Sequence, residues 1–559
     1  MEDAYKVAVV GAGPTGLVLG IELGMRGIPT ILFDPRTSTT QYPKGGTNSA
    51  RSMEHYRRYG FAAEFRKMGL PRDHPTDVAY FTRFAGHELH RVKMPSINEV
   101  LASEMPETPE PPHRASQFFL EPLLVDKLDS LPSVTLAFGH KVETIGESAN
   151  DVTLGVVECA SGKRQTCKVD YVVGCDGANS LVRASMGVDY DGVSGKVRKF
   201  FGGKMMAIYF RSPELRAILA DRRAWQYWSY TSEQRCMMSD VDGKGAFFMH
   251  IQIPDDARPD EDDARAFIRS AAGRPIEPEI LSVSFWIAGR ALTSERMAKG
   301  RLAVVGDAAH IFTPTGGFGL NTGVDDAANL GWKLAARLQG WGGDDLIESY
   351  HTERHAIALR NTSAAAAIAD RGAACPVDEH VTEPGPQGGA SRRRTSEYLK
   401  DFAFMEFKTL GVQLGASYYG SGVVVPDGSP APDDCPTRYV PSSRPGGRLP
   451  HSWLGPDRST LDEVGTGLTL YSIGTTTDRS RWRQAADDIG VEIKFVDLSG
   501  PEHEKLFGRG LLLVRPDQHI AWRAPEAPED IGALFRLVLG LRSDPTVGTG
   551  SQAKDKVNV

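Results

Sequence analysis

Residues 5–34, YKVAVVGAGPTGLVLGIELGMRGIPTILFD, decide the fold of this chain. The apolar run at 7–10 is typical of a buried strand, helically spaced apolar residues follow the glycines, and TILFD predicts a second strand. Strand, glycine turn, helix and strand make a βαβ unit. The sequence therefore predicts a Rossmann-like α/β domain.

Three glycines in the turn GAGPTG predict a dinucleotide site. Gly11 permits the tight turn, Gly13 lets the backbone approach a pyrophosphate, and Gly16 lets helix and strand pack closely. The helix N-terminus behind them offers amide donors and a favourable dipole to phosphate groups. Asp34 ends the second strand at the distance where an acid binds a ribose hydroxyl. A glycine turn that served packing alone would leave Asp34 unexplained.

A second glycine-rich stretch, GRLAVVGDAAHIFTPTGGFGLN at 300–321, indicates which dinucleotide is bound. Asp307 follows a buried strand, where a carboxylate can accept hydrogen bonds from a sugar-alcohol chain. The loop after it leads into a helix N-terminus, whose amides can face the partial negative charge on the pyrimidine edge of a flavin. The stretch therefore favours FAD over NAD(P). A third strand and turn, CDGANSLVR at 175–183, places Asp176 before a helix start.

The composition excludes several classes of protein. The 559 residues are 41% hydrophobic and carry a net charge of −7, which gives no basis for a nucleic-acid partner. The six cysteines form no CxxC pair, so we expect no metal site and a reducing, cytoplasmic location. No apolar run reaches the roughly 18 residues of a membrane span. The acidic start MEDAYK is unlike a signal peptide.

Taken together and in this order, the three motifs resemble those of the class A FAD-dependent aromatic hydroxylases. That family includes 4-hydroxybenzoate, phenol and 2,4-dichlorophenol hydroxylases and polyketide-tailoring oxygenases. The resemblance covers about residues 5–370. It implies FAD as cofactor, NADPH or NADH as co-substrate, and O2. It also implies that a flavin C4a-hydroperoxide hydroxylates a phenolic or polyketide-like aromatic substrate.

The resemblance also implies a fold: an FAD domain of the 4-hydroxybenzoate hydroxylase type with an inserted α+β substrate domain built on an antiparallel sheet. The C-terminal segment resembles the thioredoxin-like domain of phenol-hydroxylase-type members, without a CxxC pair. Residues 375–397 are expected to form a flexible connection. The predicted boundaries are 1–71, 114–187 and 291–397 for the FAD-binding domain, 72–113 and 188–290 for the substrate domain, 398–429 for a linker, 430–545 for the thioredoxin-like domain and 546–559 for a disordered tail.

Site residues follow from local matches to the family's motifs. Arg51 matches an arginine near the FAD pyrophosphate, Gln117 matches a glutamine that contacts FAD, and Arg183 matches a residue of the motif shared with NAD(P)H. The alternatives are surface arginines for Arg51 and Arg183 and a helix-capping role for Gln117. Pro314 and Gly319 match positions beside the reacting part of the flavin, and no side-chain acid or base is assigned. The predicted cofactor set is Gly11, Gly13, Pro14, Thr15, Gly16, Asp34, Arg36, Arg51, Gln117, Asp176, Asp307, Pro314, Gly317, Gly319, Leu320 and Asn321, with Asp176 and Arg183 for NAD(P)H.

Aromatic and methionine residues in the strands of the second domain suit an apolar aromatic ligand. We predict Tyr227, Met249 and Trp286 as pocket residues; ordinary sheet core is the alternative, because only half of each strand faces one side. His250 and Arg290 are candidates to bind a phenolate or are structural. The acid that phenol hydroxylases carry upstream of the helix is missing from KGGTNSARSME. Deprotonation of a phenol must therefore come from elsewhere or from the acidity of the substrate.

Other activities on the same fold remain open. Baeyer–Villiger oxygenation would use the same motifs. A flavin halogenase would carry a WxWxIP element, which WQYW is not, and a lipid-chain reductase would lack the C-terminal domain. From another class, the chain could be a non-catalytic flavin-binding interaction protein. The intact glycine-rich loop at 312–321, called the flavin loop below, argues against that interpretation. The expected partner is a small aromatic substrate, with a homodimer as a possible assembly.

Overall fold

The structure is a computed structural model that describes residues 5–103, 105–196 and 198–541. Its central sheet has the strand order β17-β18-β9-β1-β2-β5 and is parallel except at β17–β18. Because β1 lies between β2 and β9, strand order reverses there, and ligands bind such sheets at the carboxyl ends of these strands. The bounds are β1 (Val7–Val10), β2 (Thr30–Asp34), β5 (Val134–Phe138), β9 (Tyr171–Gly174), β17 (Ala298–Lys299) and β18 (Leu302–Val304).

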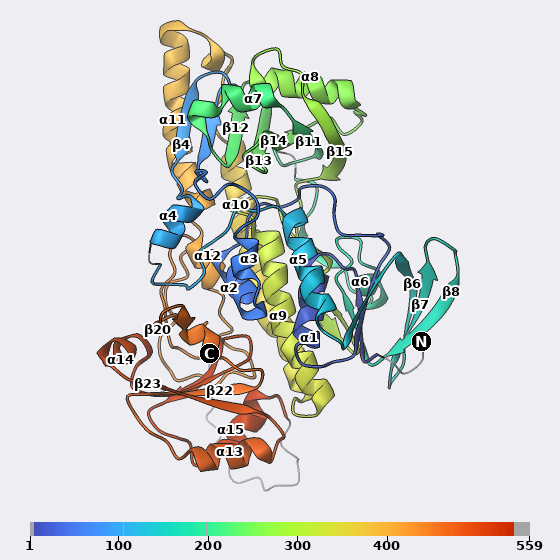
Figure 1. The fold of residues 1–559 in the computed structure, drawn as a ribbon, viewed down its shortest axis with the longest axis vertical. Helices are drawn as coiled ribbons and strands as arrows, with labels where there is room; N and C mark the ends of the chain where they lie inside the picture. The colour runs from blue at the N-terminus through green and yellow to red at the C-terminus, as the bar shows by residue number, and fades with distance from the viewer. Residues whose placement is uncertain (1–4, 104, 197, 542–559) are drawn as a thin grey trace, which may run out of the picture.

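Long helices pack beside this sheet (Figure 1). Helix α1 (Pro14–Gly24) packs against α5 (Gln117–Asp129) and α9 (Phe318–Gln339), and α9 packs against α10 (Asp344–Ala373). Glycines permit the close approach, since a Cβ on Gly20 would lie 2.7 Å from the Leu128 side chain. The shorter helices of this part are α2 (Ala50–Tyr59), α3 (Ala62–Phe65), α4 (Ile97–Ala102), α6 (Leu181–Ser185) and α12 (Leu410–Leu414).

A second sheet lies at one end of the molecule, with the order β15-β11-β14-β13-β12-β3-β4 (Figure 1). It is antiparallel except where β12 pairs with β3. Helices α7 (Pro213–Ile218) and α8 (Glu261–Ala272) cover one face, because their apolar residues share a core with the strands. The strands are β3 (Val78–Phe81), β4 (Glu88–Val92), β11 (Lys204–Arg211), β12 (Gln226–Tyr230), β13 (Arg235–Asp240), β14 (Ala246–Gln252) and β15 (Glu279–Ile287).

Two three-stranded sheets complete this part of the chain. One contains β6 (His140–Glu147), β7 (Val152–Glu158) and β8 (Arg164–Val169). The other joins β10 (Tyr190–Val193), β16 (Ala291–Ser294) and β19 (His310–Ile311), so it ties the start of the flavin loop to the connections between the two large sheets.

The C-terminal part has a four-stranded sheet in the order β23-β22-β24-β25, parallel at β22–β23 and otherwise antiparallel. It agrees with the predicted thioredoxin-like fold and lies at the opposite end of the molecule from the seven-stranded sheet (Figure 1). Its elements are β22 (Leu468–Ile473), β23 (Ile493–Leu498), β24 (Gly510–Val514), β25 (Ile520–Ala524), α13 (Arg479–Asp487), α14 (Pro501–Phe507) and α15 (Ile531–Val538), beside the short pair β20 (Trp453–Gly455) and β21 (Arg458–Ser459).

The structure corrects the prediction of a flexible connection at 375–397 and of a linker that begins at 398. Helix α11 (Gly385–Phe407) runs across this boundary, and α12 follows at once. Tertiary packing overrides the glycines at its start, since Leu399, Phe402 and Ala403 are buried against the second sheet. The predicted disordered tail, 546–559, lies outside the described residues. Within the described part of the chain, none of the helices combines the length and hydropathy of a membrane span.

Candidate cofactor and substrate site

The glycine turn after β1 has one open position and two packed ones. Gly11 has φ +101°, and a Cβ there would lie 2.3 Å from the carbonyl oxygen of Cys175. A Cβ on Gly16 would lie 2.0 Å from the carbonyl oxygen of Gly11, so helix and strand meet there. A Cβ on Gly13 would meet nothing within 4 Å, and no side chain caps α1. Free amides and open space at Gly13 fit a pyrophosphate.

Asp34 and Arg36 are brought together at the end of β2. Asp34 is 4% exposed, and its Oδ2 accepts a hydrogen bond of 2.8 Å from the backbone N–H of Ala12 in the glycine turn. Arg36 donates to Asp34 Oδ1 from Nε at 3.0 Å and to the carbonyl oxygen of Ala12. The predicted ribose-binding acid is therefore held at the turn.

Gln117 does not cap a helix, because the N-cap of α5 is Ser116. Its Nε2 donates to Glu121 Oε1 at 2.6 Å, and its backbone N–H donates to the carbonyl oxygen of Lys44. Glu121 is fully buried and also contacts Arg36 and the N–H of Thr40. The sequence prediction missed Glu121, for which helical spacing from Gln117 was the available signal.

Asp307 lies in a short 3-10 turn (Gly306–Ala308) after β18, and its backbone is held from two sides. Tyr190 donates its hydroxyl to the carbonyl oxygen of Asp307 at 2.5 Å. Arg183 donates to the carbonyl oxygen of Ala308 at 3.0 Å, and its guanidinium lies 3.7 Å from the centre of the Tyr190 ring. Arg183 is therefore not a free surface arginine. It links the segment that contains Asp176 to the turn that contains Asp307.

The carboxyl of Asp307 is accessible to solvent, yet the protein around it is dense enough to raise its pKa by desolvation. Electrostatic interactions with His310 and Lys44 oppose that rise in pKa. An accessible oxygen in a desolvated setting suits a ligand hydroxyl. Lys44 was missed because nothing in the Pro–Gly loop around it marks a contact with a residue so distant in sequence.

Asp176 has one occupied and one free oxygen. Oδ2 accepts hydrogen bonds from the backbone N–H groups of Leu181 and Val182 at 2.7 and 3.3 Å and so caps α6. Oδ1 is buried and has no hydrogen-bond partner in the described ranges, and burial raises the pKa of the carboxyl. Its contact with FAD or NAD(P)H stays a prediction.

The loop that leads into α9 presents backbone where side chains would interfere. Gly316 and Gly317 have φ +69° and +68°, and a Cβ on Gly317 would lie 2.7 Å from Thr47 Cβ. Pro314 is exposed, and a Cβ on Gly319 would contact only Phe312, at 3.6 Å. Helix α9 starts at Phe318 without a side-chain cap, so its first amides remain free for a ligand.

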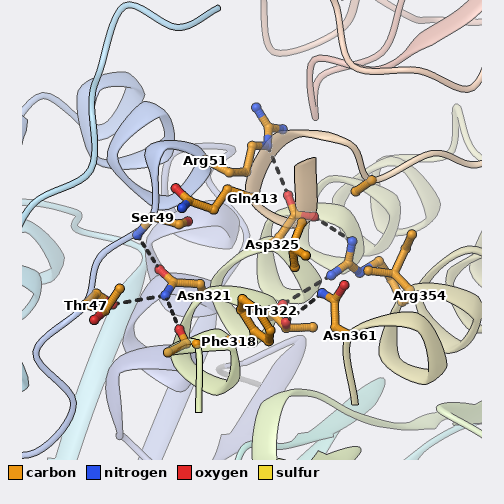
Figure 2. Close-up of a pocket in the computed structure, with 15 residues that line it drawn as sticks. Thr47, Ser49, Arg51, Phe318, Asn321, Thr322, Asp325, Arg354, Asn361 and Gln413 are labelled. Atoms are coloured by element: carbon orange, nitrogen blue, oxygen red, sulfur yellow. Dashed lines mark hydrogen bonds and ion pairs between the residues drawn. The ribbon is translucent and has the colours of Figure 1, made fainter. Parts of the chain in front are cut away.

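Asn321 connects the start of α9 to the loop before α2 (Figure 2). Its Oδ1 accepts from Ser49 N–H at 2.8 Å and from Ser52 Oγ at 2.6 Å. Its Nδ2 donates to the carbonyl oxygens of Thr47 and Gly317 at 3.0 and 2.6 Å. The side chain therefore supports the loop, which leaves the backbone amide as the group that can face a flavin.

A narrow cavity of about 30 Å³ lies beside Asn321 (Figure 2). Asp325 and Arg354 form part of its wall, in an ion pair whose carboxylate also contacts Arg51. Such a polar, charged wall makes it a poor place for an aromatic ring.

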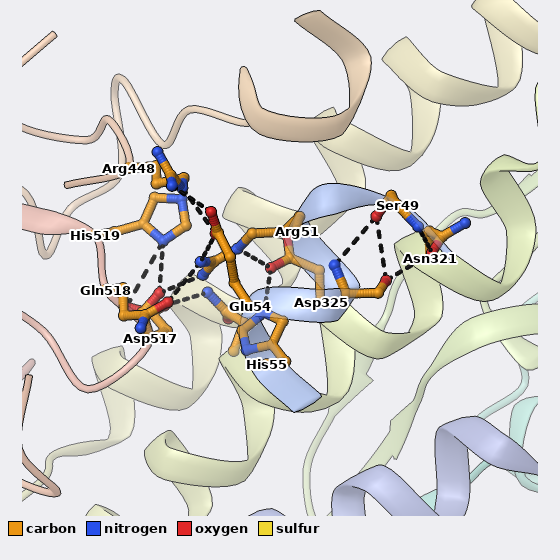
Figure 3. Close-up of polar contacts among 12 residues, drawn as sticks. Ser49, Arg51, Glu54, His55, Asn321, Asp325, Arg448, Asp517, Gln518 and His519 are labelled. Atoms are coloured by element: carbon orange, nitrogen blue, oxygen red, sulfur yellow. Dashed lines mark hydrogen bonds and ion pairs between the residues drawn. The ribbon is translucent and has the colours of Figure 1, made fainter. Parts of the chain in front are cut away.

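Arg51 is buried and faces the C-terminal part of the chain (Figure 3). Its Nε contacts Asp325 at 3.2 Å, and its Nη1 contacts Glu54 and Gln518 at 3.1 and 2.6 Å. Its Nη2 donates to the carbonyl oxygen of Asp517 at 2.7 Å. A surface position for Arg51 was the wrong alternative, and its contact with a pyrophosphate stays a prediction.

The three predicted substrate residues divide between the faces of the second sheet. Tyr227 and Met249 belong to the core that α7 and α8 cover. Trp286 belongs to the opposite face, together with Phe312 and Phe318 of the flavin loop. We therefore correct the assignment of Tyr227 and Met249: alternation puts neighbouring residues on opposite faces, and the pattern of these strands does not say which face the loop meets.

His250 and Arg290 differ in what they offer. His250 contacts the Trp286 ring edge-on at 5.7 Å, and within the described part of the chain neither its Nδ1 nor the Trp286 Nε1 has a hydrogen-bond partner. Burial lowers the pKa of His250 to about 4, so it is neutral near pH 7. The carbonyl oxygen of Arg290 accepts from Thr313 Oγ1 at 3.1 Å, which is a backbone role. Among the described residues, no cluster of side chains could hold a metal ion.

Two protein-family models match the chain: an FAD binding domain over residues 4–365 and the C-terminal region of aromatic-ring hydroxylases over 442–540. A putative polyketide hydroxylase of Streptomyces halstedii is 30% identical, over 93% of each chain. Phenol 2-monooxygenase of Pseudomonas sp. (strain EST1001) is 27% identical, over 96% of this chain and 92% of that one. The structure of RebC with bound 7-carboxy-K252c superimposes with a TM-score of 0.88 at 32% identity, over 97% of this chain and all of that one.

Proposed function

This chain belongs to the FAD-dependent aromatic-ring hydroxylases and is a flavoprotein monooxygenase; from that premise we propose that it hydroxylates a polycyclic, phenolic substrate of the polyketide type. The observation that carries the cofactor part of the proposal is the open turn at Gly13, with Asp34 bonded to the same turn, Asp307 in the turn after β18 and the uncapped helix α9 after it. Polar groups at three strand ends and a free helix N-terminus suit one extended dinucleotide.

We assign the parts of FAD to this row of groups. Asp34 would bind the ribose, and the amides behind Gly13 would bind the pyrophosphate. Asp307 would accept hydrogen bonds from the ribityl chain. The backbone amides of Gly319, Leu320 and Asn321 would face the pyrimidine edge, with Pro314 beside the ring. When bound, FAD would supply the redox chemistry: it accepts a hydride from NAD(P)H and then reacts with O2.

The substrate would lie between the flavin loop and the face of the second sheet that is opposite α7 and α8, part of which α11 covers. The lining there is aromatic, and the unpaired nitrogens of His250 and Trp286 offer hydrogen bonds to substrate oxygens. Such a layer orients a flat ring by stacking and excludes water from it. The number of aromatic residues in this cluster favours a polycyclic substrate over a single phenol ring. They are Tyr80, Phe200, Phe201, Trp225, Trp228, Tyr230, Trp286, Phe312 and Phe318.

Oxidation of NADPH by the FAD-loaded protein tests the function. We expect faster oxidation when a hydroxylated naphthalene or anthraquinone is added, and a product heavier by one oxygen atom. Product structure by NMR separates ring hydroxylation from Baeyer–Villiger ester formation. A protein that binds FAD but never oxidises NADPH faster with any phenol would instead be a flavin-binding interaction protein.

Two assignments extend this function to the cell. We propose that the enzyme works in the cytoplasm, because its six cysteines are unpaired, as a reducing compartment would leave them.

We also propose a homodimer, for which the apolar side chains exposed on the outer strand β15, among them Phe285 and Ile287, offer a surface. Sedimentation at two protein concentrations tests the assembly.

A further inference from the structure

Glu406, near the end of α11, is a buried acid without a full set of partners. Glu406 is 5% exposed, and its Oε2 has no hydrogen-bond partner among the residues that the structure describes. Burial raises the pKa of this carboxyl to about 8, and the backbone N–H of Gly316 is the group that opposes the rise. This amide belongs to the flavin loop, so Glu406 lies where the loop meets the second sheet.

The groups around Glu406 leave it unneutralised. Tyr80 and Tyr230, on β3 and β12, interact with it electrostatically. The Tyr80 hydroxyl is fully buried, with no hydrogen-bond partner in residues 5–103, 105–196 and 198–541. Arg235 is the nearby cation, with its guanidinium 5.0 Å from the centre of the Tyr230 ring. Its Nη atoms donate to the backbone carbonyl oxygens of residues 372, 373 and 375 instead.

Two unpaired polar groups in one aromatic layer are costly. An unsatisfied buried donor or acceptor costs about 1–3 kcal/mol and more when charged. Native proteins leave few such groups, and each calls for an explanation. Tyr80 lies 5.9 Å from Trp228 in a stacked pair and 5.9 Å from Tyr230, so its unpaired hydroxyl belongs to a layer of aromatic rings with which Glu406 interacts.

We propose that Glu406 Oε2 accepts a hydrogen bond from the phenolic hydroxyl of the substrate and takes its proton, with the Tyr80 hydroxyl as second partner of the same oxygen. The inference rests on the proposed function. Glu406 would supply the base that deprotonates the phenol, a base that the loop before α2 lacks. Glu406 lies more than three hundred positions after that loop and on a different element.

The proton transfer is balanced without any redox change. The substrate O–H bond breaks, an O–H bond forms at Glu406 Oε2, and the electron pair stays on the phenolate oxygen. The ring becomes more electron-rich and so a better target for an electrophilic oxygen. The proton returns to the product hydroxyl before release. The carboxylate form of Glu406 takes the proton, and its population grows as the pH approaches the raised pKa of about 8. A carboxyl with this pKa is closer to a phenol, whose pKa is about 10, than an ordinary acid is, so the proton can pass in both directions.

The test uses the FAD-loaded enzyme and two probes, 2-naphthol and 2-methoxynaphthalene, which differ in one hydroxyl proton. Binding is followed by the change in the flavin absorption spectrum. We expect the wild type to bind 2-naphthol at least tenfold more tightly than its methyl ether, and Glu406→Gln to bring this ratio close to one. Glu397→Gln, at an exposed acid of the same helix, is the matched control and should keep the wild-type ratio. Tyr80→Phe should lower the ratio by a smaller factor.

The possible results distinguish a failure of the role proposed for Glu406 from a failure of the proposed function. A wild type that discriminates between the probes and a Glu406→Gln variant that does so equally would overturn the role of Glu406. So would a variant that loses FAD affinity as strongly as 2-naphthol affinity, because the acid would then serve only to hold the flavin loop. A wild type that binds neither probe and oxidises NADPH no faster with any phenol would contradict the proposed substrate class, and this inference with it.

Discussion

Arg515, after β24, forms two hydrogen bonds of 2.6 and 2.8 Å to the carboxylate of Glu353 on α10, and both side chains are buried. Lys333 on α9 contacts the same carboxylate at 2.6 Å, and Asp517 balances Arg515. The neighbouring Gln518 reaches Arg51 on α2 (Figure 3). The C-terminal domain is thus joined by buried charges to the helices that carry the flavin loop.

Loss of Arg515 should destabilise the protein strongly. Arg515→Met leaves Glu353 and Asp517 buried with less compensation, which typically costs about 3–5 kcal/mol. Urea unfolding followed by tryptophan fluorescence measures the loss. Arg509→Met, at an exposed arginine of the same domain, is the control and should change the free energy of unfolding by less than about 0.5 kcal/mol. Equal stabilities of the two variants would show that the network is dispensable.

Two glycines of the first turn should respond differently to valine. Gly13→Val should fold with the wild-type melting temperature but fail to bind FAD, because the new side chain fills open space. Gly16→Val should unfold at a lower temperature, because its Cβ would lie 2.0 Å from a backbone oxygen. Thermal melts of the apoproteins and FAD titrations check both. Normal FAD binding by Gly13→Val would contradict the pyrophosphate assignment.

Asp307→Ala should weaken FAD binding by about tenfold or more, because a buried hydrogen bond to a charged group contributes about 1.5–3 kcal/mol. Tyr190→Phe should weaken it less, since it loses only the bond that orients the backbone of Asp307. Fluorescence titration of free FAD measures both constants. An Asp307→Ala variant with full affinity would refute the ribityl assignment.

Conservative changes on the two faces of the second sheet should separate stability from binding. Tyr227→Phe removes the acceptor of a 2.7 Å hydrogen bond from Ala224 N–H in the covered core, so it should lower stability by about 1 kcal/mol and leave 2-naphthol binding unchanged. Trp286→Phe should weaken 2-naphthol binding with little change in stability. If Tyr227→Phe weakened 2-naphthol binding and Trp286→Phe lowered only the stability, Tyr227 would be a pocket residue after all.

Glu406 should make the stability of the apoprotein depend on pH. Its pKa is raised from 4.5 to about 8 in the folded protein, so the stability it contributes is present below pH 4.5 and is lost as the pH rises towards 8. The facing Tyr80, Tyr230 and Cys375 have raised pKa values and stay neutral in this window. In unfolding at pH 5.5 and 7.5, wild type should lose up to about 1.4 kcal/mol per pH unit relative to Glu406→Gln. If the stabilities of the wild type and of Glu406→Gln change equally with pH, the carboxyl of Glu406 is in contact with water or a cation instead.

Much of the cofactor site could be read from the sequence because its parts are local. Asp34 ends β2, and Asp307 lies in the turn after β18 of the same sheet, so parallel pairing alone brings them to one edge. Arg183 could be placed near this edge but not oriented. Its bond to the carbonyl of Ala308 depends on how two turns pack, which neither turn encodes by itself.

The sequence by itself determined the βαβ start, the order of the three motifs and the absence of a thiol pair in the C-terminal domain, because these depend on residues close together along the chain. Only the tertiary structure decided which face of the second sheet meets the flavin loop, since a strand with apolar residues on both sides has no preferred face. It alone brought Arg51 to Gln518 and Glu406 to Gly316, because contacts between such distant segments arise from the packing of whole domains.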